Sequence, residues 1–269
     1  MSTKFHRTIL TTGGASGIPV KSFATQWGAN QFPPIYSFVF NVALQFFGPV
    51  QYTVDGFEKT FAISHIGHAL AFSFLRCHLA DTARIVVVSS GTHDPAQQSG
   101  MPDAYYSSAE ELAHPTEQSS QNKGRQRYST TKLTNILYTY SLHRRFEAIN
   151  QKAGKHWTVV TFDPGMMPGK GDWTRTRWFC NRKVLMGETL AEGYTSFASL
   201  DTSKHPDSGI FGSDDGSIGN GAYYEGPKRI KSSEASYDKA KQEDLWQWTV
   251  KTLADSEFDM AALDLRDLL

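Results

Sequence analysis

The sequence has no excess charge of either sign, almost no cysteine and no long hydrophobic run. Its 27 Lys and Arg residues match its 27 Asp and Glu residues, and such a balanced chain is not expected to take nucleic acid or an anionic membrane as its main partner. Two cysteines, Cys77 and Cys180, cannot build a disulfide framework and indicate a reducing compartment. The most apolar stretch, residues 35–47, contains polar side chains and is too short to span a bilayer.

The first residues lack the apolar core and the cleavage pattern of a signal peptide, so we expect a cytoplasmic protein. The sequence leaves the oligomeric state open. Hydrophobic residues make up 39% of the 269-residue chain, which is enough to bury the core of a single domain covering residues 1–269.

Strand and helix patterns alternate along the chain. Strands are predicted at residues 7–11, 35–40, 84–91, 155–163 and 221–225. Helices are predicted at residues 55–79, 128–149, 186–200 and 236–253, and residues 92–127 form a long polar excursion. This alternation predicts an α/β fold with a mostly parallel sheet.

The stretch TGGASGIPV, residues 12–20, follows the first predicted strand. A strand that runs into a Gly-rich turn and a helix begins a dinucleotide-binding unit, because Gly allows the tight turn and the helix N-terminus faces the pyrophosphate. Pro19 stands where a third glycine is expected. Proline is tolerated in the first turn of a helix, so the substitution removes an N–H and adds a side chain where the helix meets the strand.

The pattern Tyr-x-x-x-Lys occurs three times, so the spacing alone carries no information. The pairs are Tyr128/Lys132, Tyr224/Lys228 and Tyr237/Lys241. The second pair encloses Gly-Pro, which breaks the helix that would place both side chains on one face. The third pair lies in a polar, Lys-rich stretch typical of a solvated face. Only the first pair opens a long helix downstream of a buried strand.

Tyr128 and Lys132 can therefore form a proton-transfer pair. At this spacing the ammonium can lie beside the phenol and lower the phenol pKa from about 10. A phenol tuned in this way gives or takes a proton at a carbonyl or an alcohol, and a hydroxyl from Ser89-Ser90 can hold the same oxygen. The alternative is that both are ordinary surface residues of a helix.

In sequence order, the segments TGGASGI, FNVALQ, RIVVVSS, YSTTK and FDPGMMPG resemble the short-chain dehydrogenase/reductase family. DGFEKTFAISHIGHAL and YSTTKLTNILYTYSLHRR are most similar to its retinol-dehydrogenase and protochlorophyllide-reductase branch. The resemblance covers nearly the whole chain and is most specific over residues 55–165. It implies a Rossmann-like, mostly parallel sheet with helices on both faces and an NADP(H) cofactor.

The resemblance also implies the roles of individual residues. Ser90, in preference to Ser89, would hold the substrate oxygen, Tyr128 would donate the proton, and Lys132 would tune Tyr128 and bind a cofactor ribose. The cofactor-binding residues that it implies are Gly13, Ser16, Gly17, Ile18, Asn41, Lys132, Pro164, Gly165 and Met166.

Four positions depart from the pattern of this family, of which Pro19 is the first. Val42-Ala43 replaces Ala-Gly after Asn41 and narrows the place where the cofactor ribose and adenine would lie. Ser64 stands in place of a catalytic Asn, and its shorter hydroxyl is not expected to copy the main-chain kink and water contact of that residue. Lys170 stands where a Thr usually binds the carboxamide.

The largest departure is the short interval between Gly17 and Asn41. Only 23 residues separate them, whereas three helices, two strands and their loops would need about 70. The second and third strands of the family are therefore predicted to be missing, which leaves the order 1-4-5-6-7 and an exposed first strand. The shortened cofactor half would cover residues 1–54, where no acid is available to bind a ribose, and the catalytic half residues 55–269.

Three functions are consistent with these residues. The first is an NADP(H)-dependent oxidoreductase that interconverts a carbonyl and an alcohol on a hydrophobic small molecule through Ser90, Tyr128 and Lys132. The second is a non-redox enzyme, an isomerase, dehydratase or cyclase, on the same scaffold. The third is a cofactor-free, catalytically silent protein. No metal is expected, because His65 and His68 have no neighbours that would complete a ligand set and are interpreted as helix residues.

Overall fold

The computed structural model describes residues 8–12, 20–165, 219–225 and 228–255, whose strands form one six-stranded sheet in chain order. The strands are β1 (Thr8–Thr11), β2 (Ile35–Phe40), β3 (Leu79–Val88), β4 (His156–Asp163), β5 (Ala222–Glu225) and β6 (Lys228–Ile230). Neighbours from β1 to β5 pair in parallel, and β6 pairs with β5 in the antiparallel sense. The sheet is therefore mostly parallel and places β1 at its edge directly beside β2, as the predicted loss of two strands requires.

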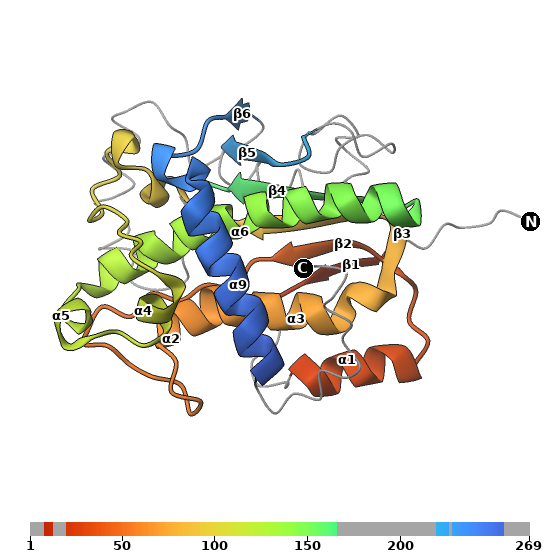
Figure 1. Cartoon of the computed structure of the whole chain (residues 1–269), viewed down its shortest axis with the longest axis horizontal. Helices are drawn as coiled ribbons and strands as arrows, with labels where there is room; N and C mark the ends of the chain where they lie inside the picture. The colour runs from red at the N-terminus through yellow and green to blue at the C-terminus, as the bar shows by residue number, and fades with distance from the viewer. Residues whose placement is uncertain (1–7, 13–19, 166–218, 226–227, 256–269) are drawn as a thin grey trace, which may run out of the picture.

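The long helices lie along one face of this sheet (Figure 1). The α-helices are α1 (Val20–Ala29), α2 (Lys59–Phe61), α3 (Gly67–Leu75), α4 (Ala109–Ala113), α5 (Glu117–Ser120), α6 (Gly124–Ala153) and α9 (Lys239–Asp255). The single-turn segments are η1 (Ala62–Ile66, π-helical), η2 (Arg76–His78), η3 (Gly91–His93), η4 (Pro95–Gln97) and η5 (Glu234–Tyr237). Helix α1 packs against α3, and the Phe72 ring of α3 lies 5.9 Å from the Phe146 ring of α6.

One shared face for α1, α3 and α6 follows from the strand order. Right-handed crossovers that all step in the same direction across a parallel sheet place every connecting helix on the same side. The direct step from β1 to β2 therefore brings α1 to the face that carries α3 and α6. The helix predicted at 186–200 lies outside the described residues.

The central strands are buried on both faces, which explains their continuous hydrophobic runs. Ile85 and Val87 of β3 join the cluster beneath the helices, whereas Val86 and Val88 join a second cluster with Val160 on the opposite face. These five side chains are between 0% and 6% exposed. β3 is thus held rigidly, and its carboxyl end is a firm platform for the residues that follow it.

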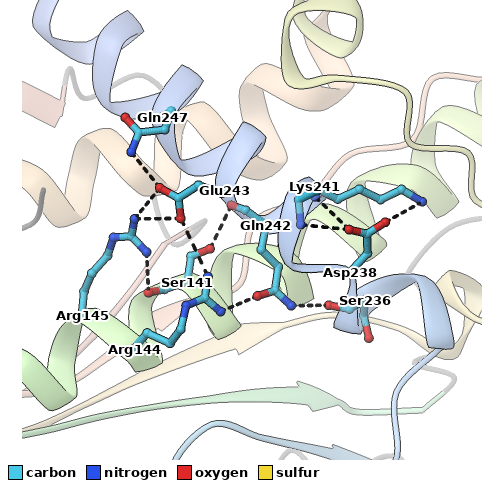
Figure 2. Close-up of polar contacts among 10 residues, drawn as sticks. Ser141, Arg144, Arg145, Ser236, Asp238, Lys241, Gln242, Glu243 and Gln247 are labelled. Carbon is cyan, nitrogen blue, oxygen red and sulfur yellow. Dashed lines mark hydrogen bonds and ion pairs between the residues drawn. The ribbon is translucent and has the colours of Figure 1, made fainter.

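Helix α9 crosses α6 and is fixed to it by polar contacts (Figure 2). One guanidinium nitrogen of Arg145 donates to both carboxylate oxygens of Glu243, at 3.0 and 3.1 Å, and the same guanidinium lies 4.1 Å from the centroid of the Trp246 ring. The Ser141 hydroxyl donates to the Gln242 carbonyl at 3.0 Å. These contacts hold α6 from its solvent side, while the sheet holds it from the other.

Candidate active site

Three parallel strands end at the same edge of the sheet, and the end of β3 contacts the first third of α6. β2 leads into Asn41, β3 into Ser89-Ser90, and β4 into Pro164-Gly165. Ligands of open parallel sheets bind beyond the carboxyl ends of the strands. The structure therefore brings the described members of the predicted site to the place where such a fold binds its ligand.

Lys132 connects α6 to the end of β3. It is 3% exposed, and its Nζ donates to the Val88 carbonyl at 3.2 Å and lies 5.4 Å from the centroid of the Tyr128 ring. Asn135, one turn further along α6, donates to the same carbonyl at 3.0 Å. Lys132 is therefore not the solvated surface residue of the alternative interpretation, whereas Tyr128 beside it is half-buried.

The two serines after β3 have different tasks. The Ser89 hydroxyl is buried and donates to the main-chain carbonyl of Lys132 at 2.8 Å, so it serves to hold α6. Ser90 is half-buried, and its hydroxyl accepts only a long bond, of 3.4 Å, from the Thr92 N–H. This difference favours Ser90 over Ser89 as the hydroxyl that can turn to a ligand.

The turn that carries Ser90 is anchored by a histidine that the sequence analysis did not single out. His93 is 1% exposed, and its Nδ1 lies 2.7 Å from the Ser90 carbonyl while its Nε2 accepts the Ser233 N–H at 3.1 Å. Because Nε2 is an acceptor, Nδ1 carries the proton and donates to Ser90. Burial lowers the pKa of His93, which keeps the ring neutral.

The protonation of Tyr128 and Lys132 differs from the expected pattern. Burial lowers the pKa of Lys132 to about 8, and the nearby Asp163 carboxylate opposes this change. Burial raises the pKa of Tyr128 to about 12, and Asp163 acts in the same direction. The predicted lowering of the phenol pKa by Lys132 is therefore wrong for this structure, because desolvation and a buried negative charge outweigh the ammonium.

Asp163 was missed by the sequence analysis although it lies in the quoted segment FDPGMMPG. It is 6% exposed, and its two oxygens accept the N–H of Gly91 at 2.6 Å and the N–H of Gly165 at 2.8 Å. An acid at the end of a buried strand, directly before Pro-Gly, was the available signal.

The entrance to the Gly-rich turn is tied to the end of β2. Thr12 Oγ1 accepts the N–H groups of Asn41 and Val42, at 2.9 and 3.1 Å, and lies 3.1 Å from Nε2 of His68. Since Thr12 Oγ1 already accepts two bonds, its proton goes to His68. Of the predicted cofactor-binding residues, Gly13, Ser16, Gly17, Ile18 and Met166 lie outside the described residues, as do Pro19, Lys170 and Cys180.

The helix predicted at 55–79 contains a distortion at Ser64. It begins at Lys59 and passes through the π-helical segment η1 before α3, so a main-chain kink is present although the expected Asn is not. Ser64 is fully buried, and its hydroxyl has no hydrogen-bond partner within the described residues. The expectation that a serine would not copy the kink is corrected, because a π-helical segment forms here with serine in the place of the expected asparagine.

His65 and His68 are helix residues, as interpreted from the sequence, and both are buried. His65 Nε2 lies 2.8 Å from the Thr249 hydroxyl of α9, and burial lowers the pKa of both His65 and His68 to about 3. Within the described ranges, no group of three or more His, Cys, Asp or Glu residues could hold a metal ion. In the same ranges, none of the helices combines the length and apolarity needed to cross a membrane.

The other two Tyr-x-x-x-Lys pairs do not form such a site. Tyr224 lies on β5 and Lys228 on β6, so the pair spans a hairpin, as the Gly-Pro between them predicts. Tyr237 is 49% exposed, and Lys241 pairs with Asp238 at 3.8 Å.

Comparison with known proteins gives relatives by sequence and by structure, although no protein-family model matches the chain. Polyprenol dehydrogenase from Homo sapiens is 29% identical over 212 residues, which cover 74% of this chain and 55% of that protein. Retinol dehydrogenase 14 from Mus musculus is 34% identical over 139 residues (51% and 36%), and the WW domain-containing oxidoreductase from Danio rerio is 34% identical over 131 residues (47% and 29%). The chain thus spans about half the length, or less, of these relatives.

Among solved structures, an uncharacterized protein from Mycobacterium paratuberculosis has the same fold. It superposes with a TM-score of 0.54 at 19% identity and covers 87% of this chain and 71% of its own.

Proposed function

We propose that this chain, which belongs to the short-chain dehydrogenase/reductase family, is an NADP(H)-dependent oxidoreductase that interconverts a carbonyl and an alcohol on a hydrophobic small molecule. The catalytic residues in this proposal are Ser90, Tyr128 and Lys132. The observation that carries it is the buried Lys132, whose ammonium reaches the end of β3 beside the Tyr128 ring and the Ser90 turn. The names of two relatives, a polyprenol dehydrogenase and a retinol dehydrogenase, support an apolar alcohol or its carbonyl as the substrate class.

The nicotinamide half of the cofactor fits the donors that the site offers. An ammonium has three N–H groups, and within the described residues Lys132 uses one of them, on the Val88 carbonyl. The remaining two suit the hydroxyls of a ribose. Pro164 and Gly165 at the end of β4, with Asn41 at the end of β2, would border the same group, and we assign Gly13, Ser16, Gly17, Ile18 and Met166 to it by resemblance.

The reaction would use the protein side chains for proton transfer and orientation. Tyr128 is protonated at neutral pH, since burial raises its pKa to about 12, and it would donate its proton to the carbonyl oxygen. The Ser90 hydroxyl would donate a hydrogen bond to the same oxygen and hold it. Lys132 would supply a positive charge near the phenol when the proton leaves. The nicotinamide, when bound, supplies or accepts the hydride.

The adenosine half of the cofactor has less support from this fold. β1 is the edge strand of the sheet, and Ile9 on it is 48% exposed. Among the described residues, the two strands that form the adenosine wall in a Rossmann order of 3-2-1-4-5-6 are absent on that side. This observation favours the second candidate, a non-redox isomerase, dehydratase or cyclase that uses Tyr128 and Lys132 without hydride transfer.

Titration of the protein with NADPH and NADH, followed by calorimetry, separates the two candidates. Micromolar binding of either dinucleotide supports the oxidoreductase, and the absence of binding at millimolar concentration refutes it. Turnover of a carbonyl or alcohol without cofactor, abolished by Tyr128→Phe, would establish the non-redox enzyme instead. Tyr237→Phe is the matched control, because Tyr237 has the same spacing to a lysine outside the site and should retain full activity.

The proposal treats the chain as one domain, with residues 1–54 contributing the cofactor side and residues 55–269 the catalytic side. We place its activity in the cytoplasm, on the low cysteine content of the sequence. The proposed partner is a small molecule.

A further inference from the structure

The ring of His93 joins the Ser90 turn to a segment that lies much later in the chain. His93 is 1% exposed, and both nitrogens of its ring have partners. Its Nδ1 lies 2.7 Å from the main-chain oxygen of Ser90, and its Nε2 lies 3.1 Å from the main-chain nitrogen of Ser233. Because Ser233 directly precedes η5, one buried ring connects two turns whose residues are 140 positions apart.

The imidazole can make both contacts in only one protonation state. The main-chain N–H of Ser233 can only donate, so Nε2 must offer its lone pair. The main-chain oxygen of Ser90 can only accept, so Nδ1 must carry the proton. The Ser233 N–H therefore selects the tautomer that donates a hydrogen bond to Ser90.

These contacts fix the main chain of Ser90 and leave its side chain able to turn. The Ser90 carbonyl accepts the main-chain N–H of His93 at 3.1 Å in addition to the bond from Nδ1, so both of its lone pairs are used. The Ser90 hydroxyl, by contrast, accepts a long bond of 3.4 Å from the Thr92 N–H. A hydroxyl that holds a ligand oxygen benefits from this combination, because a fixed main chain determines where the hydroxyl can reach.

The segment that His93 contacts is itself bound to α6, the helix that carries the proton-transfer pair. The hydroxyl of Tyr140 on α6 lies 2.7 Å from that of Ser232, which in turn lies 2.7 Å from that of Ser236. All three of these side chains are buried. Ser90 is therefore tied to α6 through the His93 ring and this cluster of three hydroxyls.

We propose that His93 is a positioning residue, which orients Ser90 relative to the proton-transfer pair by the hydrogen bond from its Nδ1. The Ser233 N–H fixes the tautomer in which this bond forms. The inference rests on the proposed function, which assigns the substrate oxygen to Ser90. It predicts that the two ring nitrogens are not equivalent, because only the bond from Nδ1 holds Ser90 directly.

The first experiment observes the tautomer. The protein is labelled with isotopic nitrogen in its histidine rings, NMR spectra are recorded at neutral pH, and the loss of signals in His93→Asn or His93→Gln identifies those of His93. We expect a protonated Nδ1 and an unprotonated Nε2. A proton on Nε2, protons on both nitrogens, or exchange between the two tautomers would overturn the proposal.

The second experiment measures how firmly the Ser90 turn is held. In a chain that carries Cys77→Ser and Cys180→Ser, the substitution Ser90→Cys supplies the only thiol, and its rate of alkylation by iodoacetamide is recorded. His93→Gln places its amide near the position of Nε2 and loses the bond to residue 90, so the rate should rise roughly two- to tenfold, the effect of one lost hydrogen bond. His93→Asn places its amide near the position of Nδ1, keeps that bond and should react at the rate of the chain with His93.

His65→Gln is the matched control, because His65 is a second buried histidine, whose Nε2 lies 2.8 Å from the Thr249 hydroxyl. It should leave the alkylation rate unchanged. An unchanged rate in His93→Gln, equal increases in His93→Gln and His93→Asn, or an increase in His65→Gln would overturn the proposal.

The two experiments do not depend on each other or on catalysis. If the chain with Ser90→Cys does not fold, the tautomer in the parent protein decides the outcome alone. Because neither readout needs a cofactor or turnover, failure of the proposed oxidoreductase activity is distinguishable from failure of the role of His93.

Discussion

Replacing Lys132 by methionine should make the protein more stable at neutral pH while removing its proposed activity. The pKa of Lys132 is held at about 8 instead of 10.5, because burial penalises the charged ammonium. Each tenfold change in a protonation equilibrium is worth about 1.4 kcal/mol, so keeping this charge inside costs the fold about 3 kcal/mol below pH 8. Methionine has a similar length and carries no charge.

One loss reduces the expected gain. The substitution removes the bond from Nζ to the Val88 carbonyl, worth about 1 kcal/mol, although that carbonyl keeps its bond from Asn135 at 3.0 Å. We therefore expect Lys132→Met to raise the free energy of unfolding at pH 7 by about 1 to 2 kcal/mol.

The decisive test is how the stability difference between Lys132→Met and the parent protein changes with pH. Between pH 8 and 10.5 the unfolded parent chain holds a proton on Lys132 that the folded chain has released, so the parent gains stability as the pH rises. The variant lacks this group, and its advantage should disappear towards pH 10. Guanidinium unfolding at pH 7 and pH 10 measures both differences, with Lys241→Met as the control at a partly exposed lysine of the same Tyr-x-x-x-Lys spacing. A variant that is less stable than the parent by the same amount at both pH values would refute the reasoning.

Two packing predictions accompany this one. A methyl group on Gly124 would lie 1.7 Å from the main-chain oxygen of Phe46, so Gly124→Ala should lower the free energy of unfolding by about 1–3 kcal/mol. Gly48 has open space around it, so Gly48→Ala should leave the stability unchanged. Equal melting temperatures for the two variants would contradict this prediction. The Tyr106 hydroxyl donates to Asp244 at 2.6 Å, and Tyr106→Phe should cost about 2 kcal/mol in the same assay. Tyr105→Phe, at a side chain 59% exposed, should change nothing, and a matching loss there would show that the bond is not the cause.

Much of the sheet could be predicted because its strands are buried on both faces. The run Ile35–Phe40 was predicted with the bounds that it has in the structure, and β4 differs from its prediction by one residue. The deletion could be inferred from chain length alone, since 23 residues cannot hold the missing elements. Helix α6 extends beyond its prediction at both ends, because polar positions such as Arg127 are buried against the loop 46–48.

The sequence predicted which residues pair in the site, but it did not predict the direction in which their pKa values are shifted. Pairing Tyr128 with Lys132 required only helical spacing and the strand before it. The direction of the Tyr128 pKa depended on burial and on Asp163, which is 35 positions away in the chain and meets α6 only in three dimensions. The hydrogen bond between His93 and Ser233 likewise joins residues that are 140 positions apart. The local sequence around each of them does not indicate that the two residues meet.

The sequential strand order has a consequence for how the chain folds. Among the described residues, every strand from β2 to β6 pairs with the described strand that precedes it in the chain, so this sheet can grow in one direction. A doubly wound sheet must return from one edge to its centre, and such non-local closure slows folding. Helix α9 is the exception, because its Thr249 reaches back 184 residues to His65. We therefore expect the sheet to assemble as the polypeptide is synthesised, and the packing of α9 on α6 to follow once the C-terminal helix has been made.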